Sequence, residues 1–281
     1  MKNTLYIFWN RSSIKVLVLF FFSVLSFSTT QQKPNVLLIN IDDMGWKDVG
    51  FMGSDFYETP NIDALSAAGM VFNNGYTSAA NCAPSRACLL TGLWPQRHGV
   101  FTVGSSQRGN KEDRKIIPIK NTRFLSNKFK VIPQYLKEVG YNTYHIGKWH
   151  ISKNPKDFGF DVNIGGSDAG FPKSYFPPYN NVDVEGSGTA YLTDLLTEKA
   201  VTLMTASKEP FFMYYATYAV HLPINPIPEL VPKYSKRESK LGQTNAKYAS
   251  MVENLDKNIG VLIKGLEDAV SYTHLTLPTK A

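Results

Sequence analysis

Residues 35–43 read Asn-Val-Leu-Leu-Ile-Asn-Ile-Asp-Asp, a mostly apolar run that ends in two carboxylates. Such a run predicts a β-strand buried on both faces, as in parallel sheets that are covered by helices. In open sheets of this kind, ligands bind beyond the carboxyl ends of the strands. The stretch therefore predicts an α/β fold, with Asp42 and Asp43 placed where a site would form.

The rest of the chain alternates between helical and extended patterns. Helices are predicted where apolar residues recur at helical spacing between end signals, such as Thr59-Pro60 and Gly69. The predicted helices cover residues 60–68, 132–139, 192–204 and 248–266, and the predicted strands cover residues 35–41, 70–76, 141–146 and 211–218. The sequence thus predicts an α/β fold with a mostly parallel central sheet and helices on both faces.

Composition narrows the class of protein and of partner. The 281 residues are 43% hydrophobic and 19% charged, which supports one sizeable core and argues against a disordered tail protein. The net charge of +7 would attract nucleic acid, an anionic membrane or a sulfated glycan, and charge alone does not choose among them. The loop at residues 104–130 carries eight Lys or Arg against Glu112 and Asp113, so it is either a solvated surface loop or a basic rim beside a site for an anionic substrate. A second loop, residues 165–188, is expected to shape the pocket.

The two ends of the chain are expected to lie outside the catalytic fold. Residues 1–30 combine a basic start with the apolar run 16–27, which predicts a signal peptide and export to the periplasm or the medium. That run is shorter than the ~20 residues of a spanning helix, so no stable membrane anchor is expected. Residues 271–281 (SYTHLTLPTKA) follow neither a helical nor a strand pattern, and are expected to be an artefactual tail.

Chemically capable side chains follow each of the four predicted strands. In chain order they are Asp42 and Asp43, Cys82 and Arg86, Lys148 and His150, and His221. The carboxyl ends of parallel strands meet at one edge of a sheet, so we expect these groups to converge there. Such a distribution is hard to obtain by chance.

Taken singly, most of these residues have an ordinary structural explanation. Asp42 and Asp43 could cap a helix or form an Asx turn, but a buried carboxylate pair needs neutralising, which a hard divalent cation does with oxygen ligands. Lys148 could be a surface lysine, and His150 a histidine satisfied within the core. His221 alone is an equally weak signal, so the prediction depends on their convergence.

Cys82 and Cys88 are the two cysteines of the chain. In an oxidising compartment a disulfide between them is the ordinary expectation, although a bridge across so short a loop adds little stability. Pro84 suits the start of a helix, which would place Cys82 near a positive helix end and beside Arg86. A thiolate there is a good nucleophile, so we interpret Cys82 as chemically active.

Residues 82–92 (CAPSRACLLTG) resemble the motif of type I sulfatases, in which Cys-x-Pro-Ser-Arg is followed by an apolar pair and Thr-Gly. Residues 140–150 (GYNTYHIGKWH) are similar to the second motif of the family, and residues 35–45 and 59–63 to its opening segments. The resemblance runs from about residue 35 to residue 268. It implies an alkaline-phosphatase-like fold in which residues 31–270 are an incomplete N-terminal catalytic domain, with the C-terminal part missing.

The resemblance implies that a maturation enzyme oxidises Cys82 to formylglycine, whose hydrated form attacks the sulfur of a sulfate ester. It implies calcium as the cofactor, held by Asp42, Asp43 and the modified Cys82. Arg86, Lys148 and His150 would orient the diol and stabilise charge. His221 would contact the sulfate or protonate the leaving oxygen.

The family completes its calcium site with an Asp and an Asn from a later strand, and grips sulfate with a later lysine; none of these is present in the 281 residues. The expected substrate is a sulfated polysaccharide or glycosaminoglycan, with no nucleic-acid partner. Two alternatives stay open. One is a phosphonate or phosphodiester hydrolase of the same superfamily, and the other is a non-catalytic protein that binds sulfated glycans.

Overall fold

The computed structural model describes residues 33–186 and 189–269. The expected signal peptide and the expected tail at residues 271–281 lie outside these residues. The chain divides into two units, residues 1–34 and 35–281, and every element below belongs to the second. In the described part of the chain, no helix is both long enough and apolar enough to cross a membrane.

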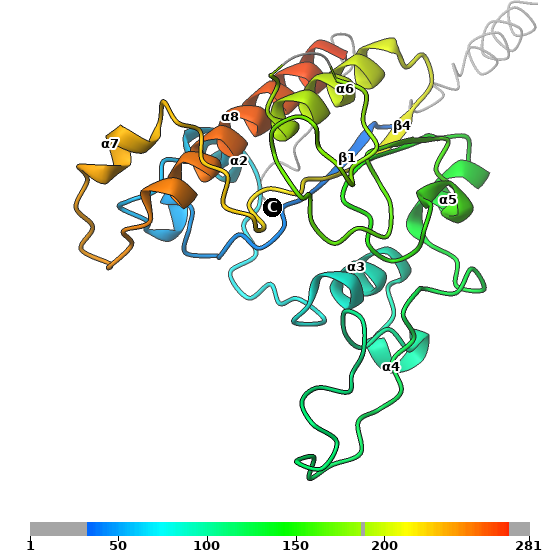
Figure 1. Cartoon of the computed structure of the whole chain (residues 1–281). Coiled ribbons are helices and arrows are strands. Elements are labelled where there is room, and N and C mark those ends of the chain that lie inside the picture. Colours follow the sequence, from blue (N-terminus) through cyan, green and yellow to red (C-terminus); the bar gives the residue numbers. More distant parts are fainter. Residues whose placement is uncertain (1–32, 187–188, 270–281) are drawn as a thin grey trace, which may run out of the picture. The chain divides into compact units, whose positions relative to one another are not determined.

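A parallel four-stranded sheet forms the centre of this unit (Figure 1). Its strands are β1 (Val36–Asn40), β2 (Asn142–Gly147), β3 (Val162–Ile164) and β4 (Phe211–Ala216), in the order β1-β4-β2-β3. Tyr214 of β4 lies opposite Leu38 of β1 on one side and His145 of β2 on the other. The predicted parallel sheet is confirmed, and β3 is an additional strand too short to give a periodic signal.

The helices that the sequence predicts are all present. They are α2 (Pro60–Ala68), α5 (Ile132–Glu138), α6 (Leu192–Ala206) and α8 (Ala246–Ala269). The described residues also form α3 (Cys82–Thr91), α4 (Pro95–His98), α7 (Val231–Ser235) and the short 3-10 helices η1 (Gly50–Met52) and η2 (Pro155–Phe158). The two loop regions expected from composition contain no helix and no strand in their described residues, 104–130 and 165–186.

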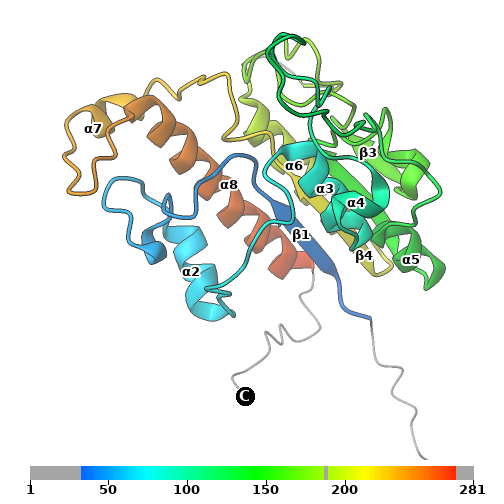
Figure 2. The same ribbon diagram turned by 90° about the horizontal axis from the view of Figure 1, so that it is seen from below.

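Each face of the sheet is covered by its own layer of helices (Figures 1 and 2). The odd-numbered residues Phe211, Met213 and Tyr215 of β4 pack into a core with α6 and α8. The intervening Phe212 and Tyr214 pack into a second core with α3 and the region of α5. Because both faces are buried, every residue of β4 is apolar or aromatic, which is the continuous pattern that predicted this strand.

The prediction of a strand at residues 70–76 is wrong. Phe72 and Tyr76 are 77% and 88% exposed, and no strand of the described residues pairs with this segment. The amide of Gly75 donates to the carbonyl of Phe72 at 3.2 Å and closes a turn. The intervening Asn-Asn-Gly sequence favours that turn over an extended strand. We expected Cys82 to follow a strand. It instead begins helix α3 after a long loop.

Candidate active site

The three strands β1, β2 and β4 deliver their polar residues to the same edge of the sheet. Asp42 lies two residues beyond β1, Lys148 directly follows β2, and His221 lies beyond β4. Helix α3, which packs on one face of the sheet, brings Arg86 to the same place. The structure therefore brings together residues that are far apart in the sequence, as the parallel topology predicts.

Asp42 is the centre of this cluster. Its carboxylate accepts from Arg86 Nη2 at 2.9 Å through Oδ1, and its Oδ2 pairs with the ammonium of Lys148. Arg86 and Lys148 are 2% and 0% exposed, so both cations depend on this one carboxylate for neutralisation. Burial acts to raise the pKa of Asp42, but the charges of Arg86 and Lys148 outweigh it, and the pKa is lowered.

Arg86 is held by two further contacts. Its Nη1 donates to the carbonyl oxygen of Lys148 at 2.7 Å and to the Tyr214 hydroxyl at 3.4 Å. Asn40 in turn donates to that hydroxyl at 2.7 Å. Sequence reasoning missed Asn40 and Tyr214, because both lie inside strands and read there as ordinary core positions. Their contacts fix the guanidinium plane beside Asp42.

Cys82 is the first residue of α3 and is partly exposed, while Cys88 is buried. Both thiols are free, so the disulfide alternative is not the arrangement observed. Cys88 packs into the core, with its Sγ 3.3 Å from Nε2 of His98. Burial raises the pKa of the Cys88 thiol, which keeps it protonated and unreactive. Cys82 instead stands at the positive end of a helix dipole, near Arg86.

Three residues could contribute ligands to a cation. One ligand atom each from Asp42, Asp43 and His221 lies within 4.8 Å of the other two. The Asp43 carboxylate is 3.5 Å from Nε2 of His221, and its backbone has a φ of 57°, in the sparsely populated left-handed region. Carboxylate oxygens suit a hard divalent cation, which needs six to eight ligands in the case of calcium. The two aspartates thus fit part of such a site.

His150 also has a left-handed backbone, with a φ of 67°. Its amide donates to the carbonyl of Ser167 at 2.8 Å, and its buried Nδ1 has no hydrogen-bond partner within the described residues. Burial and the nearby charges of Lys148 and Arg86 lower the pKa of His150 to about 4, so the ring is neutral near pH 7. A Cβ on Gly170 would lie 2.6 Å from this imidazole, so the lack of a side chain there leaves room for the ring.

His221 is held by contacts from both of its sides. Its Nδ1 is 2.8 Å from the carbonyl oxygen of Leu222. The ring of Phe171 stacks on the imidazole, with centroids 5.7 Å apart and planes 1° from parallel. Phe171 belongs to the loop at residues 165–188, which we expected from the sequence to shape the pocket. The sequence did not indicate a role for Phe171 itself. The stacking fixes the direction in which the imidazole faces Asp43.

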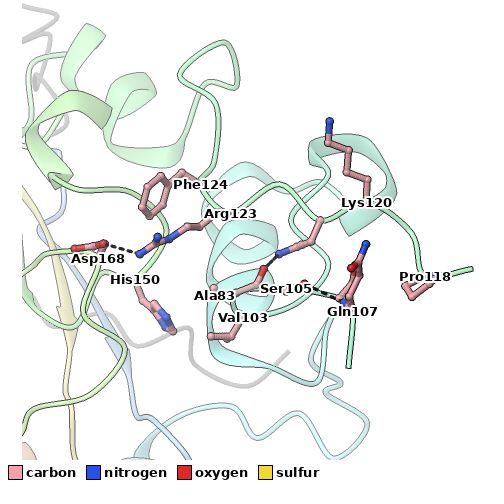
Figure 3. A pocket seen from close by; sticks show the side chains of 13 residues that line it. Ala83, Val103, Ser105, Gln107, Pro118, Lys120, Arg123, Phe124, His150 and Asp168 are labelled. Carbon is pink, nitrogen blue, oxygen red and sulfur yellow. Dashed lines mark hydrogen bonds and ion pairs between the residues drawn. The ribbon is translucent and has the colours of Figure 1, made fainter. Parts of the chain in front are cut away.

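A cavity of about 770 Å³, which we call the loop cavity, has His150 in its lining (Figure 3). Its walls include Ala83, the neighbour of Cys82, together with His150. Most of the remaining lining comes from the basic loop at residues 104–130, from which Lys120 and Arg123 contribute cations. Most other residues of this loop are exposed, so both expectations for it stay open. Arg123 of that loop pairs with Asp168 at 3.2 Å across the cavity wall.

The fold and this edge cluster define an α/β protein of the alkaline-phosphatase-like class. The family model described as Sulfatase matches residues 34–274. The chain therefore belongs to the sulfatase family, as its motifs indicated.

Individual relatives agree with this assignment. The chain is 31% identical over 262 residues to an N-acetylgalactosamine-6-sulfatase of Mus musculus, covering 84% of this chain and 48% of the relative. It is 26% identical to an N-acetylgalactosamine-6-O-sulfatase of Bacteroides thetaiotaomicron, covering 88% of this chain and 58% of the relative. It also resembles the crystal structure of Ps i-CgsB in complex with k-i-k-neocarrahexaose, with a TM-score of 0.68 and 31% identity, covering 86% of this chain and 56% of that one. The chain spans about half the length of the curated relatives it matches.

Proposed function

We propose that the protein of which these residues form a part hydrolyses sulfate esters, with Cys82 as the site of the nucleophile after oxidation to formylglycine. One observation carries the proposal. A partly exposed cysteine at a helix N-terminus stands near a buried cluster of Arg86, Lys148 and Asp42 at the carboxyl edge of a parallel sheet. Preorganised cations of this kind stabilise the negative charge that develops when a sulfate ester is cleaved.

The roles of the remaining residues follow from their positions. Arg86 and Lys148 would orient the nucleophile and stabilise charge, since both are buried cations that Asp42 holds in place. His150 is neutral near pH 7, so the N–H of its imidazole can donate one hydrogen bond to a sulfate oxygen, while its other ring nitrogen can accept a hydrogen bond from a hydroxyl group. His221 would contact the sulfate or protonate the leaving oxygen as a general acid.

Calcium is the proposed cofactor, with Asp42, Asp43 and the modified Cys82 as ligands from this chain. The proximity of the two aspartates and their oxygen chemistry support this choice. When bound, the ion would supply positive charge that polarises the sulfate group. His221 lies within the same cluster, but nitrogen is a less typical ligand for calcium than oxygen, so we keep it for the substrate.

The proposed substrate is a sulfated carbohydrate. Two relatives are named for sulfated N-acetylgalactosamine, and one similar structure contains k-i-k-neocarrahexaose. The basic lining of the loop cavity supports an anionic substrate for this chain as well. The proposal includes a maturation enzyme that oxidises Cys82, and export with removal of residues 1–30, which N-terminal sequencing of the exported protein would check.

Turnover of an aryl sulfate and of an aryl phosphodiester by the complete protein tests the reaction. We expect hydrolysis of the sulfate, dependence on calcium after treatment with a chelator, and a Cys82 peptide whose mass fits an aldehyde. Cys82→Ala should lower kcat by at least about 10³-fold, because the nucleophile is lost. Faster turnover of the phosphodiester would favour the phosphonate or phosphodiester hydrolase alternative. An unmodified thiol with no turnover of either compound would favour a binding protein.

A further inference from the structure

The loop cavity is larger than a sulfate group alone would fill. Its volume of about 770 Å³ lies in the range of roughly 300–1,000 Å³ that is usual for small-molecule sites. Ala83 and His150 connect it to the catalytic cluster, so a substrate whose sulfate lies at Cys82 would extend into it. The cavity is therefore placed to bind the parts of the substrate that carry no reacting bond.

The cavity carries an excess of positive charge. Two cations, Lys120 and Arg123, line it against one carboxylate, Asp168. Lys120 is exposed and has no ion pair or hydrogen bond within the described residues, so its charge is free for a ligand. The Gln107 side chain adds an amide group to the same wall, whereas the Asn121 amide is already bonded to the backbone of residues 101, 102 and 104. This lining suits a polar ligand with a negative charge of its own.

Arg123 is held in place but can exchange its partner. Its guanidinium carbon lies 4.9 Å from the centroid of the Phe124 ring, and its Nη2 lies 3.2 Å from Asp168 (Figure 3). The side chains of this pair are 69% and 39% exposed, and exposed ion pairs contribute little to stability. A ligand anion can therefore replace Asp168 at Arg123 with little loss, while Phe124 keeps the guanidinium oriented.

We propose that the loop cavity binds a second anionic group of the substrate, with Lys120 and Arg123 as the residues that determine this specificity. The substrate class is thus a sulfated carbohydrate that carries, beside the sulfate ester to be cleaved, a further sulfate ester or a uronate carboxylate. The inference rests on the proposed function, because it assumes that the cleaved sulfate lies at Cys82. It goes beyond that function by assigning a role to residues outside the catalytic cluster.

Three matched oligosaccharides test the proposal with the complete protein. One carries a single sulfate, one carries a second sulfate, and one carries a uronate carboxylate. We expect one of the doubly charged compounds to have a kcat/KM at least about tenfold above that of the singly charged one, the gain from one charge-assisted hydrogen bond. The compound that shows the higher kcat/KM tells whether the cavity recognises a sulfate or a carboxylate. Equal kcat/KM values for all three would overturn the proposal.

Variants locate the effect in the cavity. Lys120→Ala and Arg123→Ala should each reduce the preference for the second charge about tenfold, through KM rather than kcat. Lys120→Arg should retain most of that preference. Lys115→Ala removes the same charge from the same loop but does not line the cavity, and should leave the preference unchanged. A loss as large in Lys115→Ala as in Lys120→Ala would show that the effect is one of overall charge, and would refute the assignment.

Binding separates this proposal from the proposed reaction. Absence of aryl sulfate turnover would count against the reaction itself. In that case, calorimetric titration of Cys82→Ser with the same oligosaccharides, with and without Lys120→Ala, measures recognition without turnover. Tighter binding of a doubly charged compound that is lost in Lys120→Ala would support the cavity even if the reaction assignment failed. Equal affinities in the two variants would refute it.

Discussion

Asp42 combines a structural and a functional demand on one side chain. Its carboxylate is the counter-charge for the buried Arg86 and Lys148, and it is also one of the proposed calcium ligands. The adjacent Asp43 has a side chain that is 58% exposed, with His221 as its neighbour. The sequence does not distinguish the two adjacent aspartates. In the fold, Asp42 is a buried counter-charge for two cations, whereas the Asp43 side chain is largely exposed.

Asp42→Asn should lower the free energy of unfolding by about 3–5 kcal/mol, because two buried cations lose their common counter-charge. Urea denaturation at neutral pH measures this loss. Asp43→Asn is the matched control, since Asn tolerates the left-handed backbone at this position. It should change stability by less than about 0.5 kcal/mol while weakening calcium binding. Equal stability of the two variants would contradict the structural role of Asp42.

Gly170→Ala tests how closely the loop at residues 165–188 fits His150. The added methyl group would meet the imidazole at 2.6 Å, so the ring or the loop must move. A displacement near 1 Å in a catalytic group can cost about 10²-fold in rate. We expect aryl sulfate turnover to fall by that order, and Ala169→Gly, a change on the same loop, to have a much smaller effect. Unchanged turnover in Gly170→Ala would show that His150 does not need this position.

At the scale of elements, the start of α2 depends on α8. Thr59 precedes α2 but makes no capping hydrogen bond with its side chain. Asp256 of α8 accepts instead from the amides of Asn61 and Ile62, at 3.1 and 2.9 Å. It also accepts from the Asn61 side chain at 2.8 Å. A buried carboxylate from a distant helix therefore satisfies the free amides at the start of α2.

Asp256→Ala should destabilise the protein by about 1–3 kcal/mol, because the amides of Asn61 and Ile62 lose their acceptor. Thermal and urea unfolding measure the change. Asp268→Ala is a control on the same helix, because its exposed pair with Lys264 should contribute less than about 1 kcal/mol. If both variants lost the same stability, the helix α8 rather than the cap would be responsible.

At the scale of the whole molecule, burial of histidines in the core makes stability depend on pH. His145 of β2 lies among the rings of Trp149, Phe160 and Tyr214, with centroid distances of 5.3, 5.4 and 5.6 Å. Burial lowers its pKa from 6.5 to about 3, and its Nδ1 lies 3.0 Å from the Asn163 side chain. The folded protein thus keeps this ring neutral where the unfolded chain would protonate it.

Below pH 6.5 the unfolded chain binds a proton at His145 that the folded protein does not bind. The free energy of unfolding therefore decreases as the pH is lowered from 6.5 to about 3. The expected contribution is about 1.4 kcal/mol per pH unit within that window. His145→Gln can keep a hydrogen bond to Asn163 but cannot be protonated. Its free energy of unfolding, measured by urea denaturation at several pH values, should therefore depend less steeply on pH than that of the wild type. Parallel pH profiles would argue against a neutral buried His145.

Most of the fold could be predicted from the sequence, because its long elements have strong periodic signals. The strands β1, β2 and β4 and the helices α2, α5, α6 and α8 all lie where the sequence places them. The segment at residues 70–76 was misassigned because its apolar residues suggested a strand, whereas its Asn-Asn-Gly turn and exposure favoured a loop. Short elements such as β3 gave no periodic signal at all.

The sequence by itself indicated a parallel α/β protein in which Asp42, Lys148 and His221 each follow a strand, whereas the strand it placed before Cys82 is absent from the described residues. These features depend on local patterns, since buried strands and helix ends have signatures of a few residues. Only the tertiary structure decided that Arg86 and Lys148 share one carboxylate. The same holds for the loop cavity that Lys120 and Arg123 line. Such contacts join residues far apart in the chain, and no local pattern carries the distance between them.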